Sequence, residues 1–197
     1  MKKPIGIFDS GVGGLTVYKS IREAFPEEDL VYFGDTARVP YGPKSPNTII
    51  EYSIQNARFL LQQGIKTLIV ACNTSSAVAI PYLKRITNIP IIGVIEPGSE
   101  EAVRTTKNKR IGVIGTEGTI RSGAYKTAIS MLDNRIEVFS IPCPLFVPIV
   151  EEGWQEHQVS FKIASEYLDS LTDLNIDTLV LGCTHYPLLS SVIQHVI

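Results

Sequence analysis

Short apolar runs recur along the chain, and each ends in glycine or small polar residues. In the first half they cover residues 4–8, 30–33, 67–71 and 91–94. The runs are continuous stretches rich in Ile, Val, Leu and Phe, without regular alternation of apolar and polar positions. Such runs are typical of parallel strands that are buried on both faces. The pattern therefore predicts an α/β fold with a mostly parallel sheet.

One helix is strongly marked between the second and third runs. Ser45 is a suitable N-cap, Pro46 fits the first helical position, and Gly64 supplies a C-terminal stop. Apolar residues fall on one face of this helix at Ile49, Ile50, Ile54, Ala57, Leu60 and Leu61. We expect that face to pack on the sheet.

The second half of the chain repeats the pattern, with apolar runs at 110–115, 136–141 and 178–182. "IGIFDSGVGGL" near the start resembles "IGVIGTEGTI", and "TLIVACNTSSA" resembles "TLVLGCTHYPL". Two matches in the same order suggest two similar α/β domains, although separate βα units can also look alike. We place the domains at residues 1–96 and 97–197, with the boundary near the "EPGSEE" stretch.

The spacing of the two matches is nearly constant. Ile5 and Ile111 are 106 positions apart, and Cys72 and Cys183 are 111 positions apart. In an open parallel sheet, ligands bind beyond the carboxyl ends of the strands. Both cysteines follow such a strand end, so they become candidate site residues.

The segment "DSGVGG" follows the first predicted strand. Thr16 stands where a dinucleotide fingerprint needs its third glycine, and the P-loop pattern is also missing. A glycine-rich turn remains, whose backbone N–H groups could hold an anion such as a carboxylate. Asp9 and Ser10 would lie beside that anion, unless Asp9 only caps a helix or turn.

A second loop, "GDTARVPYG", follows the second predicted strand. Tyr41 and Gly42 in this loop could present backbone amides and a phenol to a ligand. Taken alone, the segment is better explained as an ordinary surface turn.

Cys72 and Cys183 each stand between a strand and a helix, where backbone N–H groups favour the thiolate. Either one alone is better explained as a buried core thiol. As an equivalent pair, they would suit stereoinversion, in which one thiolate removes a proton from carbon and the other thiol delivers one. Asp9 and His185 could keep the two protonation states unequal.

Other polar residues give weaker signals. Cys143 lies between two prolines and is either a structural thiol or a pocket wall. Glu151 and Glu152 follow an apolar run, where one could face a ligand or both could begin a solvated helix. His157 and His195 have no evident partner.

Composition narrows the class of protein. With 197 residues, 44% of them hydrophobic, the chain can form sizeable cores, and its net charge of −2 includes no basic block for nucleic acid. It has neither a signal peptide nor a membrane-spanning apolar stretch, so we expect a cytoplasmic protein. Three cysteines without ligand spacing argue against a disulfide framework and a zinc site.

Six segments in order carry a resemblance to a known family: "GIFDSGVGGLTV", "GDTARVPYG", "VACNTSSA", "GVIEPG", "CPLFVPIVEEG" and "LGCTHYPLL". With them the chain resembles the glutamate racemases, of the cofactor-independent aspartate/glutamate racemase superfamily. The resemblance implies two flavodoxin-like domains with the active site between them. It also implies that glutamate is the substrate, that neither pyridoxal phosphate nor a metal is needed, and that the product D-glutamate serves peptidoglycan synthesis in bacteria.

The resemblance also assigns roles. Cys72 is implied to act on the D-glutamate face and Cys183 on the L-glutamate face, assisted by Asp9, Glu151 and His185. Glu151 fits the assisting carboxylate better than Glu152. The residues implied to bind the amino acid are Asp9, Ser10, Tyr41, Gly42, Asn73, Thr74, Thr184 and His185.

The chain departs from the family at its end. Family members continue for some tens of residues after the second cysteine motif, whereas this sequence stops at Ile197 inside an apparent helix. We therefore expect a truncated form with exposed apolar sheet surface, whose activity is open. Related racemases or isomerases of aspartate, a hydantoin or maleate, and a non-catalytic amino-acid-binding protein, are the alternatives. The oligomeric state is not indicated, and a homodimer is one option.

Overall fold

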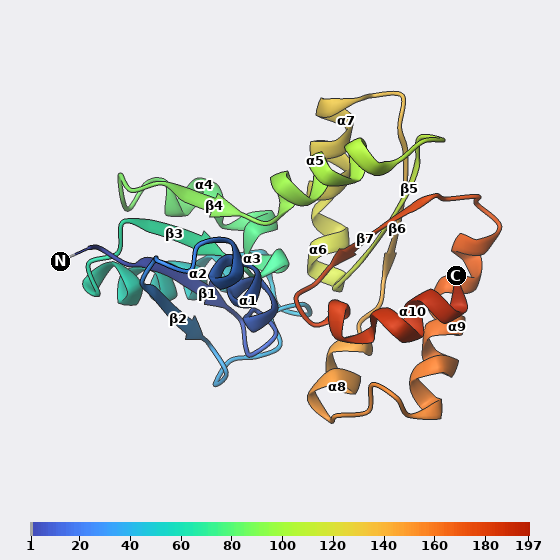
Figure 1. Cartoon of the computed structure of the whole chain (residues 1–197), viewed down its shortest axis with the longest axis horizontal. Coiled ribbons are helices and arrows are strands. Elements are labelled where there is room, and N and C mark those ends of the chain that lie inside the picture. The colour runs from blue at the N-terminus through green and yellow to red at the C-terminus, as the bar shows by residue number, and fades with distance from the viewer. Residues whose placement is uncertain (1) are drawn as a thin grey trace. The chain divides into compact units, whose positions relative to one another are not determined.

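The structure is a computed structural model that describes residues 2–197. The chain divides into two compact units, one ending at Val94 and the other running Ile95–Ile197. Both are α/β units, shown in Figure 1. None of the described helices has the length and apolar character needed to cross a membrane.

The first unit is a four-stranded parallel sheet in the order β2-β1-β3-β4. Its strands are β1 (Ile5–Asp9), β2 (Leu30–Gly34), β3 (Thr67–Val70) and β4 (Ile91–Gly93). Its helices are α1 (Leu15–Ala24), α2 (Pro46–Gln62), α3 (Asn73–Val78) and α4 (Ile80–Leu83). The parallel sheet predicted from the continuous apolar runs is thus confirmed.

The second unit has a three-stranded parallel sheet in the order β6-β5-β7. Its strands are β5 (Arg110–Gly115), β6 (Glu137–Pro142) and β7 (Thr178–Gly182). Its helices are α5 (Ile95–Thr105), α6 (Glu117–Ser122), α7 (Ala124–Leu132), α8 (Phe146–Glu151), α9 (Gln158–Thr172), the 3-10 helix η1 (Tyr186–Leu189) and α10 (Ser190–Val196). The "EPGSEE" stretch, near which we placed a boundary, is itself helical because it forms most of α5.

The two sheets share a common arrangement. The order β2-β1-β3 in the first unit corresponds to β6-β5-β7 in the second, and every pairing is parallel. Ile5 lies opposite Thr67, and Ile111 lies opposite Thr178. The residues matched in the sequence thus hold the same register, which confirms the interpretation of two similar α/β halves.

Helix α2 begins and ends as predicted. The Ser45 hydroxyl accepts a hydrogen bond from the N–H of Thr48 at 3.2 Å, and Pro46 occupies the first helical position. Gly64 follows the helix with a φ of 70°, a left-handed conformation that glycine adopts without strain. The apolar face of α2 packs on the sheet through Ala57 and Leu60, both fully buried.

The core of the second unit lies mainly between its sheet and helices α8, α9 and α10. Figure 1 shows α5 and α7 packed together on the other side of this sheet. Cys143 is fully buried in the core, and burial raises the pKa of its thiol to about 12. Its place supports the structural interpretation of this cysteine.

Candidate functional site

Cys72 lies at the topological switch point of the first sheet. Strands β1 and β3 are neighbours whose connections lead to opposite edges, and ligands of such sheets bind outside this switch point. The N–H of Ala71 donates to the carbonyl of Phe8 at 2.9 Å, which continues the pairing beyond β3. The chain therefore leaves the sheet at Cys72 beside the end of β1, where Asp9 is the last residue of the strand and Ser10 follows it.

The Cys72 thiol is buried, with 4% of the residue exposed, and it is surrounded by hydrogen-bonding groups. Its Sγ donates to the Ser10 hydroxyl at 3.7 Å and accepts from the Ser75 N–H at 3.5 Å. Burial, followed by the negative charge of Asp9, raises the pKa of Cys72, while the bonds from Ser75 and Ser10 lower it. The balance favours the protonated thiol.

Asp9 is fully buried and organises the glycine-rich turn. Its Oδ2 atom accepts the N–H groups of Gly11 and Gly14, each at 3.0 Å. The expectation that these backbone groups hold a ligand's anion is therefore wrong for Gly11 and Gly14. Asp9 is a turn carboxylate, as the alternative interpretation had it, and its charge also acts on Cys72.

Tyr41 is buried, with 1% of the residue exposed, and its phenol is engaged by polar groups of the same unit. It donates to a carboxylate oxygen of Asp35 and accepts from Asn56 Nδ2 at 3.0 Å. The Arg38 guanidinium pairs with the same Asp35 carboxylate at 2.7 Å. The phenol is therefore not presented to a ligand, so binding by this turn would use the main chain of Tyr41 and Gly42.

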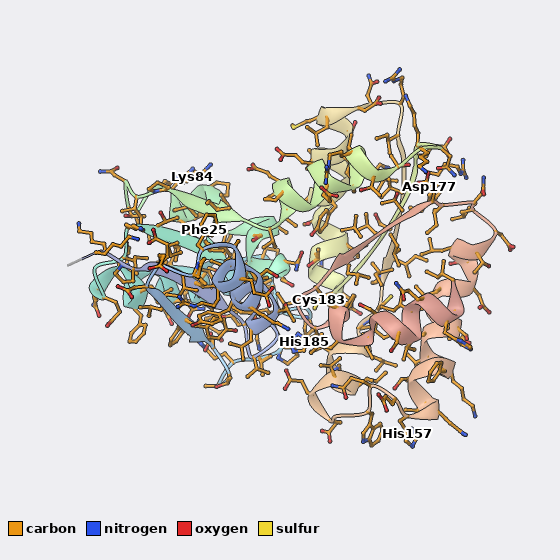
Figure 2. The ribbon with its side chains drawn as sticks, viewed as in Figure 1. Phe25, Lys84, His157, Asp177, Cys183 and His185 are labelled. Atoms are coloured by element: carbon orange, nitrogen blue, oxygen red, sulfur yellow. The ribbon has the colours of Figure 1, made fainter. Side chains whose placement is uncertain are left out.

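Cys183 occupies the corresponding position in the second unit. It follows β7, next to β5, with Gly115 opposite Gly182 at the strand ends. His185 Nδ1 lies 3.9 Å from the Cys183 Sγ atom, and the residue pair is labelled in Figure 2. The hydroxyl of Thr184 lies 3.5 Å from the same ring nitrogen.

The other side of the His185 ring meets a carboxylate. Its Nε2 atom lies 2.6 Å from Oε1 of Glu151, which ends helix α8. A carboxylate at this distance accepts a hydrogen bond from a proton on Nε2, and in the tautomer that carries only this proton the acceptor Nδ1 faces the thiol. Among the two adjacent glutamates, it is Glu151 that reaches the histidine. Cys183, His185 and Glu151 thus form a thiol–imidazole–carboxylate series.

The remaining predicted binding residues also lie near the thiols. Asn73 and Thr74 begin helix α3 directly after Cys72, and Thr184 follows Cys183; all three are buried. By contrast, His157 caps helix α9, where its Nδ1 accepts the Val159 N–H at 3.2 Å, and Figure 2 shows it away from Cys183. Within residues 2–197, no group of three or more His, Cys, Asp or Glu could hold a metal ion.

Two neighbours of the thiols were missed in the sequence. Ser75 contacts Cys72, and its position three residues after the cysteine in a helix was an available signal. Tyr125 packs against Gly182, where an added Cβ would lie 3.1 Å from the ring. Burial and the charge of Cys183 raise the pKa of Tyr125. No local pattern predicts this long-range contact.

Within its own unit, each of the two thiols has neighbours that suit proton exchange. Each thiol lies at the end of a β-strand, and each has neighbouring groups that can accept or donate a proton or a hydrogen bond. Thiols suit proton transfer at carbon because their pKa lies near ambient pH.

Comparison with known proteins points to one family. Residues 5–197 match the family model described as Asp/Glu/Hydantoin racemase. The glutamate racemase of Geobacter metallireducens is 57% identical over 195 residues, covering 99% of this chain and 72% of that protein.

Solved structures agree. The glutamate racemase isoform RacE1 of Bacillus anthracis superposes with a TM-score of 0.96 at 43% identity, covering 98% of this chain and 73% of that one. The glutamate racemase of Francisella tularensis, solved in complex with D-glutamate, gives a TM-score of 0.95 at 44% identity, covering 100% of this chain and 74% of that one. The chain belongs to the Asp/Glu/hydantoin racemase family.

Proposed function

We propose that this protein interconverts L- and D-glutamate, with Cys72 and Cys183 as the two acid/base groups. The observation that carries the proposal is the pair of thiols at equivalent strand ends of two similar units. Relatives that are more than half identical over nearly the whole chain are glutamate racemases. The Francisella tularensis relative binds D-glutamate, which makes glutamate the first substrate to test.

In the proposed reaction, the Cys72 thiolate removes the α-proton of D-glutamate, and the Cys183 thiol protonates the opposite face of the same carbon. The reverse sequence converts L-glutamate, so each thiol alternates between base and acid. The proposal requires both thiols to reach one α-carbon. Burial makes Cys72 a stronger base once it has lost its proton, because the charged form is poorly solvated.

The neighbouring groups have separate tasks in this mechanism. The Nδ1 atom of His185 accepts the proton of Cys183, and Glu151 holds the imidazole in that orientation. Asp9 keeps Cys72 protonated through its charge and fixes the glycine-rich turn. We assign binding of the amino acid to Asp9, Ser10, Asn73, Thr74, Thr184, His185 and the main chain of Tyr41 and Gly42.

The wider role follows from the reaction. D-Glutamate is a building block of bacterial peptidoglycan, and we propose that this cytoplasmic activity supplies it. No cofactor enters the proposed steps, since both protons move through thiols. We further propose residues 1–96 and 97–197 as the two domains that each contribute one thiol, with a homodimer as an option for the assembly.

The test is incubation with L-glutamate in heavy water. The proposal predicts deuterium at the α-carbon and a gradual rise of D-glutamate, followed by proton NMR and circular dichroism. A parallel incubation with L-aspartate should remain unchanged. Exchange with aspartate alone would assign another substrate of the family, and binding of glutamate without exchange would indicate a non-catalytic protein.

A further inference from the structure

Two buried serines lie behind Cys72 in the first unit and have no role in the mechanism described so far. Ser53 lies in the middle of α2 and Ser75 lies in α3, and both are fully buried. Their Oγ atoms are 3.0 Å apart, so the two hydroxyls share a hydrogen bond. They form a buried polar contact between the two helices.

Ser75 connects this pair to the catalytic thiol. Its backbone N–H donates to the Cys72 Sγ atom at 3.5 Å, and hydrogen bonding by its side chain is among the effects that lower the pKa of Cys72. The three side chains therefore form a row that begins on α2, passes through α3 and ends at the sulfur. A buried thiolate needs such donors, because water does not solvate it.

The number of protons limits how this row can be arranged. Ser53 has one hydroxyl proton and two acceptors, the Ile49 carbonyl at 2.7 Å and the Ser75 oxygen at 3.0 Å. When Ser53 donates to Ser75, the Ser75 proton is directed to Cys72. When Ser53 donates to Ile49, the Ser75 proton can turn back to Ser53.

We propose that Ser53 and Ser75 are positioning residues whose hydroxyls reorient together as Cys72 gains or loses its proton. The thiolate state receives a hydrogen bond from Ser75, which in turn receives one from Ser53. In the thiol state both protons turn away from the sulfur. This inference rests on the proposed role of Cys72 as an acid/base group.

Other groups also face the sulfur and must stay constant in a test. Asp9, at the end of β1, is the charged one, and its negative charge opposes the thiolate. Tyr32 of β2 and Tyr41 of the following loop are titratable, and burial, with a smaller contribution from the Cys72 charge, raises the pKa of both. The Ser10 hydroxyl is the remaining partner. None of them contacts Ser53 in the hydrogen bonds of the described residues.

The direct test measures the ionisation of Cys72 through thiolate absorbance near 240 nm. A Cys183→Ser background removes the other site thiol, and Cys143, whose pKa is raised by burial, contributes equally to the two spectra that are compared. Subtraction of the Cys72→Ser spectrum isolates the signal. Ser75→Ala should raise the Cys72 pKa further, because the thiolate loses a donor.

Ser53→Ala should raise the Cys72 pKa by a smaller amount, because the polarising donor of Ser75 is lost. In a Ser75→Ala background, Ser53→Ala should have no further effect. The matched control is Ser76→Ala in the same helix, because the buried Ser76 hydroxyl bonds Val70 O and Val94 N instead of the thiol. The control should leave the Cys72 titration unchanged.

Racemisation provides a second readout. With both thiols present, Ser75→Ala should lower kcat about tenfold with little change in KM, equivalent to about 1.4 kcal/mol. An unchanged Cys72 titration in Ser75→Ala would overturn the inference, as would a Ser53→Ala effect that persists without Ser75. If the unaltered chain fails to racemise glutamate while the titration shifts as predicted, the proposed function is wrong, but the effect of the two serines on Cys72 is retained.

Discussion

Cys72 and Cys183 stand at equivalent points of two similar units, yet their surroundings differ in chemistry. Hydroxyl groups and a backbone N–H surround Cys72, with one carboxylate acting through its charge. Cys183 instead faces an imidazole that is held by Glu151. At equivalent strand ends, the pKa of Cys72 is adjusted by hydroxyl and N–H dipoles, whereas Cys183 is paired with a titratable base.

This difference suits a reaction that runs in both directions. A group such as imidazole can take a proton from one thiol, while hydroxyls can only orient theirs toward or away from the other. In the proposed mechanism, unequal partners keep the two protonation states unequal, so that one thiol is the base when the other is the acid. The duplicated fold provides equal positions, and the side chains that follow each strand make them distinct.

We expect the largest effect from removing each thiol in turn. Cys72→Ala and Cys183→Ala should each lower the racemisation rate by about 10²- to 10⁴-fold, the usual contribution of a general acid or base. Circular dichroism of glutamate solutions measures the rate. Cys143→Ala is the matched control, since it removes a buried thiol from the core of the second unit. Substantial activity in either site variant would refute the two-thiol assignment.

A second change addresses the negative charge of Asp9, which acts on Cys72. Asp9→Asn keeps an oxygen that can accept the N–H groups of Gly11 and Gly14 but removes the negative charge. That charge raises the pKa of Cys72, so its removal should lower this pKa and move the corresponding limb of the pH–rate profile to lower pH.

We expect kcat of Asp9→Asn to fall about tenfold at neutral pH, because a Cys72 thiolate with a lower pKa is a weaker base toward the α-proton. The profile is measured for both enantiomers across the pH range in which the protein stays folded. A limb that stays in place, or moves to higher pH, would contradict the assigned effect of Asp9. Retention of near-native unfolding behaviour serves as the control for the turn.

Sequence patterns captured the strands and the duplication because both depend on local apolar runs and small residues at strand ends. Ile5 lies opposite Thr67 and Ile111 lies opposite Thr178, so the residues that match between the two halves of the sequence occupy equivalent positions in the two sheets. Helix α2 was equally predictable, since Ser45, Pro46 and Gly64 act on the backbone next to them.

Contacts between distant side chains could not be predicted in this way. The phenol of Tyr41 turns into a buried group with Asp35 and Asn56, although its loop reads as a surface turn. The Asp9 carboxylate accepts hydrogen bonds from backbone N–H groups of the glycine-rich turn, which the sequence motif alone suggested were available to a ligand. In both cases the decisive term is the cost of burying an unpaired polar group, which depends on the packed structure.

The smallest expected effect concerns the carboxylate behind His185, and the adjacent glutamates offer a matched pair. Glu151→Gln keeps the size of the side chain but weakens the 2.6 Å contact that holds the His185 ring, so kcat should fall by less than about tenfold. Glu152→Gln, one residue further on, should leave the rate unchanged. Equal rates in both variants would show that the imidazole needs no carboxylate to face Cys183, and the two thiol sites would then differ by His185 alone.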